Sequence, residues 1–219
     1  MNFFKLYFYI YISNPVFFIV QAMQHWMMIG SILPTSKSLR RKLYDLGIYH
    51  RKNLDTMMIH GVGSGELIYE LVRYVLVSGV TVNRCIIIDL NPQFIKRSKI
   101  LYQLLSKCYV IHTEMIFIEM DAFQTPEYLF SLGVGKLDLI VGTLPYSNMP
   151  QKIDEWIRMY YQCTKVFCYF TYATWTKRSS ARVATRQMYD KIESKFRIVQ
   201  KSELVWTNLP PAYAISAEA

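Results

Sequence analysis

The sequence predicts an α/β protein built on a doubly wound parallel sheet. Strand-like and helix-like segments alternate from residue 54 onward, and no linker or low-complexity tract divides the chain. The chain has 219 residues, which is enough for one domain with a sizeable core. In such a sheet ligands bind at the carboxyl ends of the strands, so functional residues are expected in the loops that follow them.

The first 33 residues are expected to form an apolar helical segment that lies on a membrane surface. Residues 6–23 carry no charge, and this length is close to the roughly 20 apolar residues that a spanning helix needs. Asn14 is a favoured N-cap and Pro15 a favoured first helical residue, so a helix is predicted to begin there. A half-buried interfacial helix is the preferred interpretation, and a membrane span or an ordinary core helix is the alternative.

A glycine-rich loop follows the first predicted strand, residues 56–61. This loop, Gly-Val-Gly-Ser-Gly at 61–65, precedes a helix predicted over 65–79. Such a loop allows a tight turn and lets a ligand approach the backbone closely. A phosphate-binding loop would need lysine where Glu66 stands, and a dinucleotide loop would need glycine there. The GxGxG form suits S-adenosylmethionine, which has no phosphate, although a plain tight turn would use the same residues.

Aspartates end the second and third predicted strands, which cover residues 84–90 and 114–121. Asp89 can accept hydrogen bonds from both ribose hydroxyls of a nucleoside, each worth about 1.5–3 kcal/mol. Asp121 can accept a hydrogen bond from the adenine amino group, or it can cap the turn that follows it. Each aspartate and the residue after it are expected to contact the cofactor: Asp89, Leu90, Asp121 and Ala122.

The fourth predicted strand, residues 136–146, ends in the sequence GTLPYSNMP. A turn of this kind can aim a backbone carbonyl and an aromatic face at a nitrogen that accepts a methyl group. Methyl transfer from a sulfonium is an in-line displacement, which needs mainly position and a suitable electrostatic environment. The predicted catalytic residues are Leu144, Pro145 and Tyr146, with Thr143 beside the cofactor. Tyr146, Tyr172 and Trp175 could hold a cationic product through their ring faces, or pack in the core.

The remaining elements complete a sheet of seven strands. A helix is predicted over residues 91–108, because Asn-Pro at its start is a favoured capping pair, and another helix is predicted over 150–163. A fifth strand is predicted over 165–172. The last two strands, predicted over 196–206 and 212–217, look like a closing pair.

The chain is basic, with 25 Lys and Arg against 16 Asp and Glu and a formal net charge of +9. That excess favours an anionic partner, which could be a nucleic acid, an anionic membrane or a phosphorylated substrate. Basic residues gather in segments 37–42 and 176–186, which indicate a lipid-facing patch or a solvated charged face. Ser36 and Lys37 could contact a headgroup phosphate. The four cysteines form no CxxC pair and have no zinc-ligand spacing, so no metal site is expected.

Taken together, these motifs resemble those of the bacterial phospholipid N-methyltransferases, which convert phosphatidylethanolamine to phosphatidylcholine. The segments that carry the resemblance are IGSILPTSKSLRRKL (29–43), GVGSG, IIIDLNPQF, IEMDAF, LDLIVGTLPYSNMP, CYFTY and WTNLPPAYA (206–214). The first and last segments are the more specific ones, and class I methyltransferases in general share the middle ones. The resemblance covers roughly residues 25–215.

This resemblance implies a seven-stranded Rossmann-like methyltransferase sheet over residues 34–219 and an N-terminal amphipathic helix on the cytoplasmic face of the inner membrane. It implies S-adenosylmethionine as cofactor and S-adenosylhomocysteine as product, with a phospholipid substrate and an anionic membrane surface as partners. The cofactor residues that it carries over are Gly61, Gly63, Gly65, Asp89 and Asp121. The expected substrate contacts are Ser36, Lys37, Tyr172 and Trp175.

Ile59 departs from the family pattern, which has an acidic residue two places before the first glycine. In the family that acid helps to orient the methionine amino end of the cofactor. Its loss removes one charge-assisted contact of about 1.5–3 kcal/mol, and Glu66 is a candidate to compensate for it. A second departure is Gly142-Thr143, where the family has Ser-Gly.

Two functions compete with N-methylation of phosphatidylethanolamine, which is the favoured hypothesis and involves no nucleic acid. GTLPYS is close to the Asn-x-Pro-Tyr motif of the rRNA adenine dimethyltransferases, but Thr143 stands where the adenine-binding Asn is expected. The other alternative is a lipid-binding protein with a decayed cofactor site, which Ile59 supports.

Overall fold

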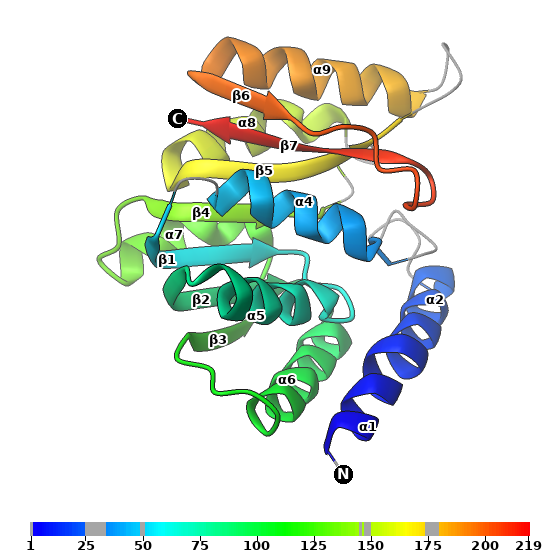
Figure 1. The fold of residues 1–219 in the computed structure, drawn as a ribbon. Helices are drawn as coiled ribbons and strands as arrows, with labels where there is room; N and C mark the ends of the chain where they lie inside the picture. The colour runs from blue at the N-terminus through cyan, green and yellow to red at the C-terminus, as the bar shows by residue number, and fades with distance from the viewer. Residues whose placement is uncertain (1, 25–33, 49–50, 145, 147–149, 174–179) are drawn as a thin grey trace.

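The computed structural model describes residues 2–24, 34–48, 51–144, 146, 150–173 and 180–219 (Figure 1). Within these residues seven strands form one sheet in the order β3-β2-β1-β4-β5-β7-β6. Their bounds are β1 Asn53–His60, β2 Thr81–Asp89, β3 Glu114–Glu119, β4 Leu137–Gly142, β5 Thr164–Tyr172, β6 Ile198–Lys201 and β7 Ala212–Glu218. Strands β1 to β5 pair in parallel, whereas β7 pairs antiparallel with both β5 and β6. The predicted doubly wound, seven-stranded α/β sheet is confirmed.

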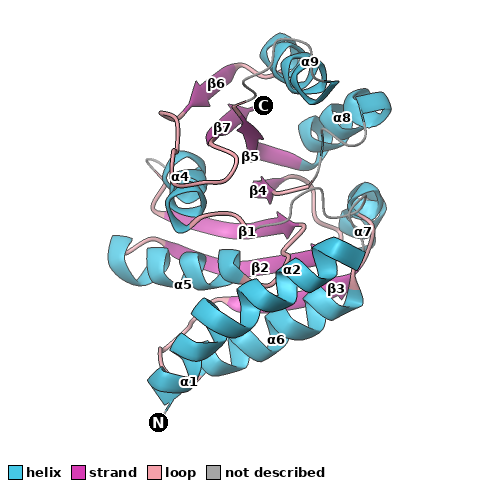
Figure 2. Cartoon of the chain, turned by 90° about the vertical axis from the view of Figure 1, so that its right-hand side faces the viewer, coloured by secondary structure: helices cyan, strands magenta, loops and turns pink. Residues whose placement is uncertain are grey.

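Helices cover both faces of the sheet (Figure 2). One face carries α4 Lys37–Ile48, α5 Glu66–Ser78 and α6 Pro92–Ser106, and the other carries α7 Thr125–Ser131, α8 Ile153–Cys163 and α9 Ser180–Lys195. Successive residues of a strand point to opposite faces, so Met57 and Ile59 of β1 pack on the α4 side and Met58 packs on the α8 side. The central strands are therefore buried on both faces, as a parallel sheet requires.

Helices α5 and α6 begin where local sequence signals predict. The side-chain oxygen of Asn91 accepts a 2.9 Å hydrogen bond from the backbone N–H of Gln93, and Pro92 is the first residue of α6. Helix α5 follows Gly65, whose φ is +98°, and ends before Gly79, whose φ is +70°. Residues other than glycine rarely adopt that left-handed backbone conformation, so both glycines serve as helix boundaries.

The N-terminal segment is one long helix, and the prediction that it begins at Asn14-Pro15 is wrong. Helix α1 Asn2–Phe8 continues through a π-helical turn, Tyr9–Ser13, into α2 Asn14–Gln24. Asn14 has helical angles, φ −68° and ψ −48°, and its backbone N–H donates to the carbonyl of Tyr9. Proline has no N–H and its ring collides with the preceding turn of an α-helix. The wider π turn accommodates Pro15 without ending the helix.

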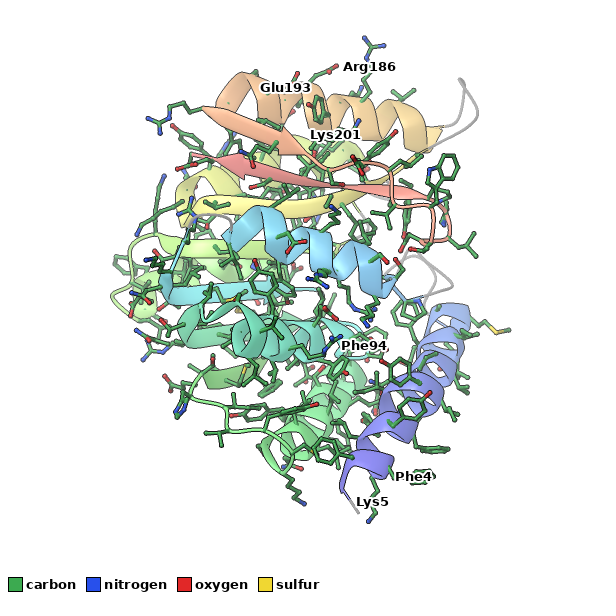
Figure 3. All side chains as sticks on the ribbon, viewed as in Figure 1. Phe4, Lys5, Phe94, Arg186, Glu193 and Lys201 are labelled. Carbon is green, nitrogen blue, oxygen red and sulfur yellow. The ribbon has the colours of Figure 1, made fainter. Side chains whose placement is uncertain are left out.

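This N-terminal helix lies beside α6, and its α2 half reaches the carboxyl ends of the central strands (Figures 1 and 2). The inner face is buried and comprises Leu6, Ile10, Asn14, Phe18, Gln21 and Ala22. The outer face is apolar and exposed, and its large residues are Phe3, Phe4, Tyr7, Phe8, Tyr11, Ile12, Val16, Val20 and Met23. Figure 3 shows Phe4 pointing away from the body of the protein. The segment Phe3–Gln24 is long and apolar enough, at 22 residues, to cross a membrane by length and composition.

Candidate active site

Four loops meet at the carboxyl edge of the sheet because strands β1 to β4 are neighbours there. The backbone N–H of Gly61 donates to the carbonyl of Ile88 at 3.0 Å, and that of Thr143 donates to the carbonyl of His60 at 2.9 Å. Next to them, the N–H of Met120 donates to the carbonyl of Asp89 at 3.1 Å. The residues predicted from separate motifs to bind one cofactor therefore lie along one edge of the sheet.

The loop at 61–65 needs glycine at all three of its glycine positions. Gly61, Gly63 and Gly65 have φ values of +74°, +57° and +98°. A Cβ on Gly61 would also lie 2.9 Å from Cδ2 of Leu144, which belongs to the loop after β4. The conformation alone disfavours any other residue at the three positions, and at Gly61 the close approach of Leu144 excludes a larger side chain as well.

Asp89 is held in place by the backbone at the end of β2. Its Oδ2 accepts a 3.1 Å hydrogen bond from the N–H of Gly63, and its Oδ1 accepts a 2.9 Å hydrogen bond from the N–H of Asn91. Burial raises the pKa of this carboxyl group to about 6, and the backbone hydrogen bonds act in the opposite direction. A carboxylate has about four acceptor positions, so Asp89 keeps the capacity to accept hydrogen bonds from a ribose diol. Leu90, the next residue, is exposed at this edge.

Asp121 caps the short 3₁₀ turn Ala122–Gln124 that follows β3. Its Oδ1 accepts a 3.0 Å hydrogen bond from the backbone N–H of Phe123. This is the capping role that the sequence leaves open beside a contact with adenine, and one carboxylate can fill both roles. Ala122 is buried immediately after it. The adenine contact therefore stays a prediction.

The loop after β4 lies against the first glycine. The hydroxyl of Thr143 donates to the carbonyl of Gly61, so these two predicted cofactor residues are in direct contact. Tyr146 lies deeper: its hydroxyl is 3.1 Å from that of Tyr160, and Trp156 meets its ring edge to face. Only 8% of Tyr146 is exposed, so this packing gives no support to a ring face that holds the acceptor. Pro145 lies outside the described residues.

Two of the four predicted substrate residues, Ser36 and Tyr172, contact the closing segment at 206–212. The backbone N–H of Ser36 donates to Oδ1 of Asn208 at 2.9 Å, and Tyr172 pairs with Ala212 across β5 and β7. The Ser36 hydroxyl accepts a hydrogen bond from the N–H of Leu39, which makes Ser36 the N-cap of α4. The three segments that resemble phospholipid N-methyltransferases outside the cofactor motifs are thus in contact.

Of the other two predicted substrate residues, Lys37 is exposed at the start of α4 and Trp175 lies outside the described residues. Lys37 is the first residue of α4, next to the Ser36 cap, and this end of α4 lies at the same edge of the sheet as the carboxyl end of β1 (Figure 1). Contacts of these residues with a headgroup phosphate stay predictions.

Ile59, which replaces the expected acid, is fully buried between the sheet and the α4–α6 layer. Glu66 is buried close to the loop, where its Oε2 accepts a 2.7 Å hydrogen bond from the hydroxyl of Ser64. Its Oε1 has no hydrogen-bond partner among the described residues. Glu66 therefore brings a carboxylate to the glycine loop from the helix that follows it.

The sequence interpretation missed that the N-terminal helix is part of this site. The side-chain amide of Asn14 donates to the carbonyl of Ser64 at 2.7 Å, and Asn91 donates to Gln21 at 3.0 Å. A Cβ on Gly63 would lie 3.3 Å from the ring of Phe18. Polar residues seven positions apart on an otherwise apolar helix share one face, and that spacing was the available signal.

Arg97 of α6 makes several contacts with the N-terminal helix. Its guanidinium donates to the hydroxyl of Ser13 at 2.6 Å and to Oδ1 of Asn14 at 3.0 Å. The same group lies 4.7 Å from the ring centroid of Tyr9 and 4.4 Å from that of Phe17. Phe94 of α6 stacks on Phe18 with centroids 5.7 Å apart. These contacts fix the helix on the turns that follow β1 and β2.

Among the residues that the structure describes, no group of three or more His, Cys, Asp or Glu side chains is arranged to hold a metal ion.

Solved structures share this fold, whereas no protein-family model and no curated protein matches the sequence. The O-methyltransferase from Bacillus cereus in complex with S-adenosylhomocysteine gives a TM-score of 0.63 at 10% identity, over 97% of this chain and 96% of that one. A protein from Listeria monocytogenes, provisionally assigned as a class I S-adenosylmethionine-dependent methyltransferase, gives 0.58 at 14% identity over 92% of this chain. This chain spans 65% of the length of that Listeria protein, which is less than two thirds.

A provisionally assigned rRNA methylase from Clostridium thermocellum gives a TM-score of 0.55 at 14% identity, over 85% of this chain and 98% of that one. The chain therefore has the Rossmann-like fold of the class I S-adenosylmethionine-dependent methyltransferases. The similar proteins are named for different acceptors, so the fold leaves the acceptor to be argued from the site.

Proposed function

We propose that this protein is an S-adenosylmethionine-dependent methyltransferase that acts at a membrane surface on the amino group of phosphatidylethanolamine and its partly methylated forms. The observation that carries the proposal is the seating of an apolar helix on the glycine loop: Asn14 and Phe18 touch the loop, while Phe4 and Met23 on the outer face are 78% exposed. A methyltransferase whose cofactor loop lies beside a lipid-compatible surface is suited to a lipid acceptor.

The residues present fit the cofactor. The positive-φ glycines form the tight turn after β1 that the GxGxG motif predicts, Asp89 offers a carboxylate for the ribose hydroxyls, and the turn at Asp121 and Ala122 would border the adenine. When bound, the cofactor supplies an electrophilic methyl group on a sulfonium. The chain would position the attacking amine through the loop after β4 and exclude water with the N-terminal helix above.

The outer face of the N-terminal helix supports the membrane location. Exposed apolar patches of this extent are rare on soluble monomers and mark interaction surfaces, and an interfacial helix buries such a face at the headgroup boundary. The net charge of +9 adds attraction to anionic lipids, of about 1 kcal/mol for each basic residue near the surface. In a bacterium we place the enzyme, as a peripheral protein, on the cytoplasmic face of the inner membrane.

The test uses labelled S-adenosylmethionine and vesicles that contain phosphatidylethanolamine with an anionic lipid. We expect labelled mono-, di- and trimethylated lipid, and no label in ribosomal RNA from a strain that lacks its adenine dimethyltransferase. Measurable binding of S-adenosylhomocysteine with no methylated lipid would refute the lipid acceptor, and label in the RNA would favour the rRNA alternative. Absence of binding would indicate a lipid-binding protein with a decayed cofactor site.

A further inference from the structure

A buried chain of hydrogen bonds runs beneath the active-site loops. His60 is the last residue of β1 and is completely buried immediately before Gly61. Its Nδ1 lies 3.1 Å from the hydroxyl of Tyr160, and its Nε2 lies 3.2 Å from the hydroxyl of Thr125. Tyr160 in turn lies 3.1 Å from the hydroxyl of Tyr146. Thr125, Tyr160 and Tyr146 belong to three different segments of the chain.

One bond in this chain sets the direction of all the others. The hydroxyl of Thr125 donates to the carbonyl of Ala122 at 2.6 Å, and a hydroxyl has a single hydrogen to donate. Thr125 must therefore accept from His60, which places the ring proton on Nε2. The sulfur of Met58, 3.0 Å from Nε2, shares the same proton as a weak acceptor.

The other half of the chain follows from this tautomer. Burial lowers the pKa of His60 to about 3, so the ring is neutral and Nδ1 carries a lone pair. Tyr160 must then donate to Nδ1, and its oxygen is left to accept from Tyr146. The phenol of Tyr160 stacks on Phe167 with centroids 3.7 Å apart, which fixes its position.

This chain of hydrogen bonds connects the turn after β3 with the segment after β4, on the two sides of the candidate site. Thr125 is the first residue of α7, next to the turn of Asp121 and Ala122 where adenine would lie. Tyr146 lies three positions after Thr143 in the segment that follows β4, where the acceptor would lie. A Cβ on Gly142 would lie 2.3 Å from the Tyr146 hydroxyl, so the strand that bears this loop is packed directly on the chain.

We propose that Thr125, His60 and Tyr160 are positioning residues whose hydrogen bonds hold the adenine-side turn and the acceptor-side loop in a fixed arrangement around the end of β1. This inference rests on the proposed function, because it assigns the two sides to a cofactor and an acceptor. None of the three side chains needs to touch either ligand. Thr125 acts through the carbonyl of Ala122, and His60 and Tyr160 act by linking Thr125 to the hydroxyl of Tyr146.

The first test separates positioning from stability with a matched pair of threonines. Thr125→Val removes the hydroxyl and keeps the shape, and we expect the affinity for S-adenosylhomocysteine to fall about tenfold, as for the loss of one buried hydrogen bond. Thr125→Ser keeps the hydroxyl and should restore the affinity. Thr164 is equally buried, and its hydroxyl lies 2.8 Å from the carbonyl oxygen of Val166 and 3.2 Å from that of Leu137, at the opposite edge of the sheet. Thr164→Val should lower the melting temperature without changing the affinity.

The proposal is overturned if wild-type protein binds S-adenosylhomocysteine and Thr125→Val binds it equally well. Wild-type protein that does not bind at all refutes the proposed function instead. In the lipid assay, Tyr160→Phe should lower kcat about tenfold and change the affinity for S-adenosylhomocysteine less than Thr125→Val does.

A second measurement tests the chain of hydrogen bonds without any ligand or activity. Nitrogen-15 NMR of the histidine rings in the full-length protein should show His60 as a neutral ring protonated at Nε2 from pH 5 to pH 8. The loss of one ring signal in His60→Gln assigns it, since the chain has four histidines. In Tyr160→Phe the Nδ1 signal should shift, because its donor is gone. A ring protonated at Nδ1, or a charged ring, would overturn the proposed direction of the chain.

Discussion

The side-chain amide of Asn14 donates a 2.7 Å hydrogen bond to the carbonyl oxygen of Ser64, which joins the N-terminal helix to the middle of the glycine loop. The bond spans 50 residues of sequence, and Asn14 is completely buried. The same side chain accepts from Arg97 of α6. A helix with an exposed apolar outer face is therefore bonded to the loop that would contact the cofactor.

Replacing Asn14 should weaken both the fold and the cofactor site. Asn14→Ala removes the donor to the Ser64 carbonyl and one of the two acceptors of the Arg97 guanidinium, at a cost of about 1–3 kcal/mol in the free energy of unfolding. Because the loop loses its contact with the helix, the affinity for S-adenosylhomocysteine should also fall several-fold. Urea denaturation and calorimetry measure the two effects.

Asn83→Ala is the control, because Asn83 makes an exposed hydrogen bond to Asp55 near the amino end of β2. It should change the free energy of unfolding by less than about 0.5 kcal/mol and leave binding unchanged. If Asn14→Ala lowers the stability but binds S-adenosylhomocysteine like the wild type, the helix packs on the loop without contributing to the site.

The outer face of the N-terminal helix should carry the attachment to vesicles. Phe4→Ser with Met23→Ser removes two large apolar side chains that are each 78% exposed. Each contributes about 1.5–3 kcal/mol when fully buried, so sedimentation with anionic vesicles should fall at least tenfold. The melting temperature should hardly change, because neither side chain packs in the core.

Phe130 on α7 provides the matched control for that experiment. It is 87% exposed but belongs to another face of the protein, so Phe130→Ser should sediment like the wild type. Equal losses in the two variants would mean that attachment is a general property of exposed apolar residues and not of this helix.

The affinity for the cofactor product should depend on pH through Asp89. Burial raises the pKa of this carboxyl group to about 6 in the free protein, and the ribose hydroxyls need the ionised form as acceptor. The affinity for S-adenosylhomocysteine should therefore be constant above about pH 7 and fall below pH 6 by at most about tenfold for each pH unit. Titration calorimetry from pH 8 to pH 5 measures it.

Asp89→Asn should bind more weakly at pH 8 and lose this pH dependence, since an amide does not titrate in the range. A wild-type affinity that is flat between pH 8 and pH 5 would show that the carboxylate does not contact the ligand.

Local chemistry was enough to predict the positions of the strands, the glycine loop and the cap of α6, although β4 and β6 end at Gly142 and Lys201, earlier than predicted. Gly65 and Asn91 both favour the start of a helix, and this preference depends only on residues within three positions of each. Asn14-Pro15 carries the same signal as Asn91-Pro92, yet it lies inside a helix. What decides its conformation is a set of partners far along the chain, at Ser64 and Arg97, and no local pattern contains them.

The surroundings of Tyr146 could not be predicted from the sequence for the same reason. The sequence shows an aromatic residue after a strand, which suits either a ligand-facing ring or a core ring. Its neighbours Trp156 and Tyr160 come from α8, and Tyr169 comes from β5. Only the packing of these elements on the sheet shows that the hydroxyl turns inward, where it joins the chain that ends at Thr125.

His60 should make the stability of the protein depend on acid pH. The pKa of its ring is lowered from 6.5 to about 3 by burial, so between these values the unfolded chain binds a proton that the folded protein does not. The stabilising contribution of the neutral ring is fully present above pH 6.5 and is lost as the pH falls toward 3. The contribution of Asp89 to stability has the opposite pH dependence. It decreases as the pH rises from 3.8 to about 6, because the pKa of its carboxyl group is raised in the folded protein.

Comparing the wild type with His60→Gln removes the Asp89 contribution, which both proteins share. The difference in the free energy of unfolding between the two should be larger at pH 7 than at pH 5, by about 2 kcal/mol, since each pH unit below 6.5 is worth about 1.4 kcal/mol. Urea denaturation at the two pH values gives this difference directly. If the difference is the same at both values, His60 takes up its proton in the folded protein as readily as in the unfolded chain. The ring could then donate from both nitrogens, and Tyr160 could not be donating to Nδ1.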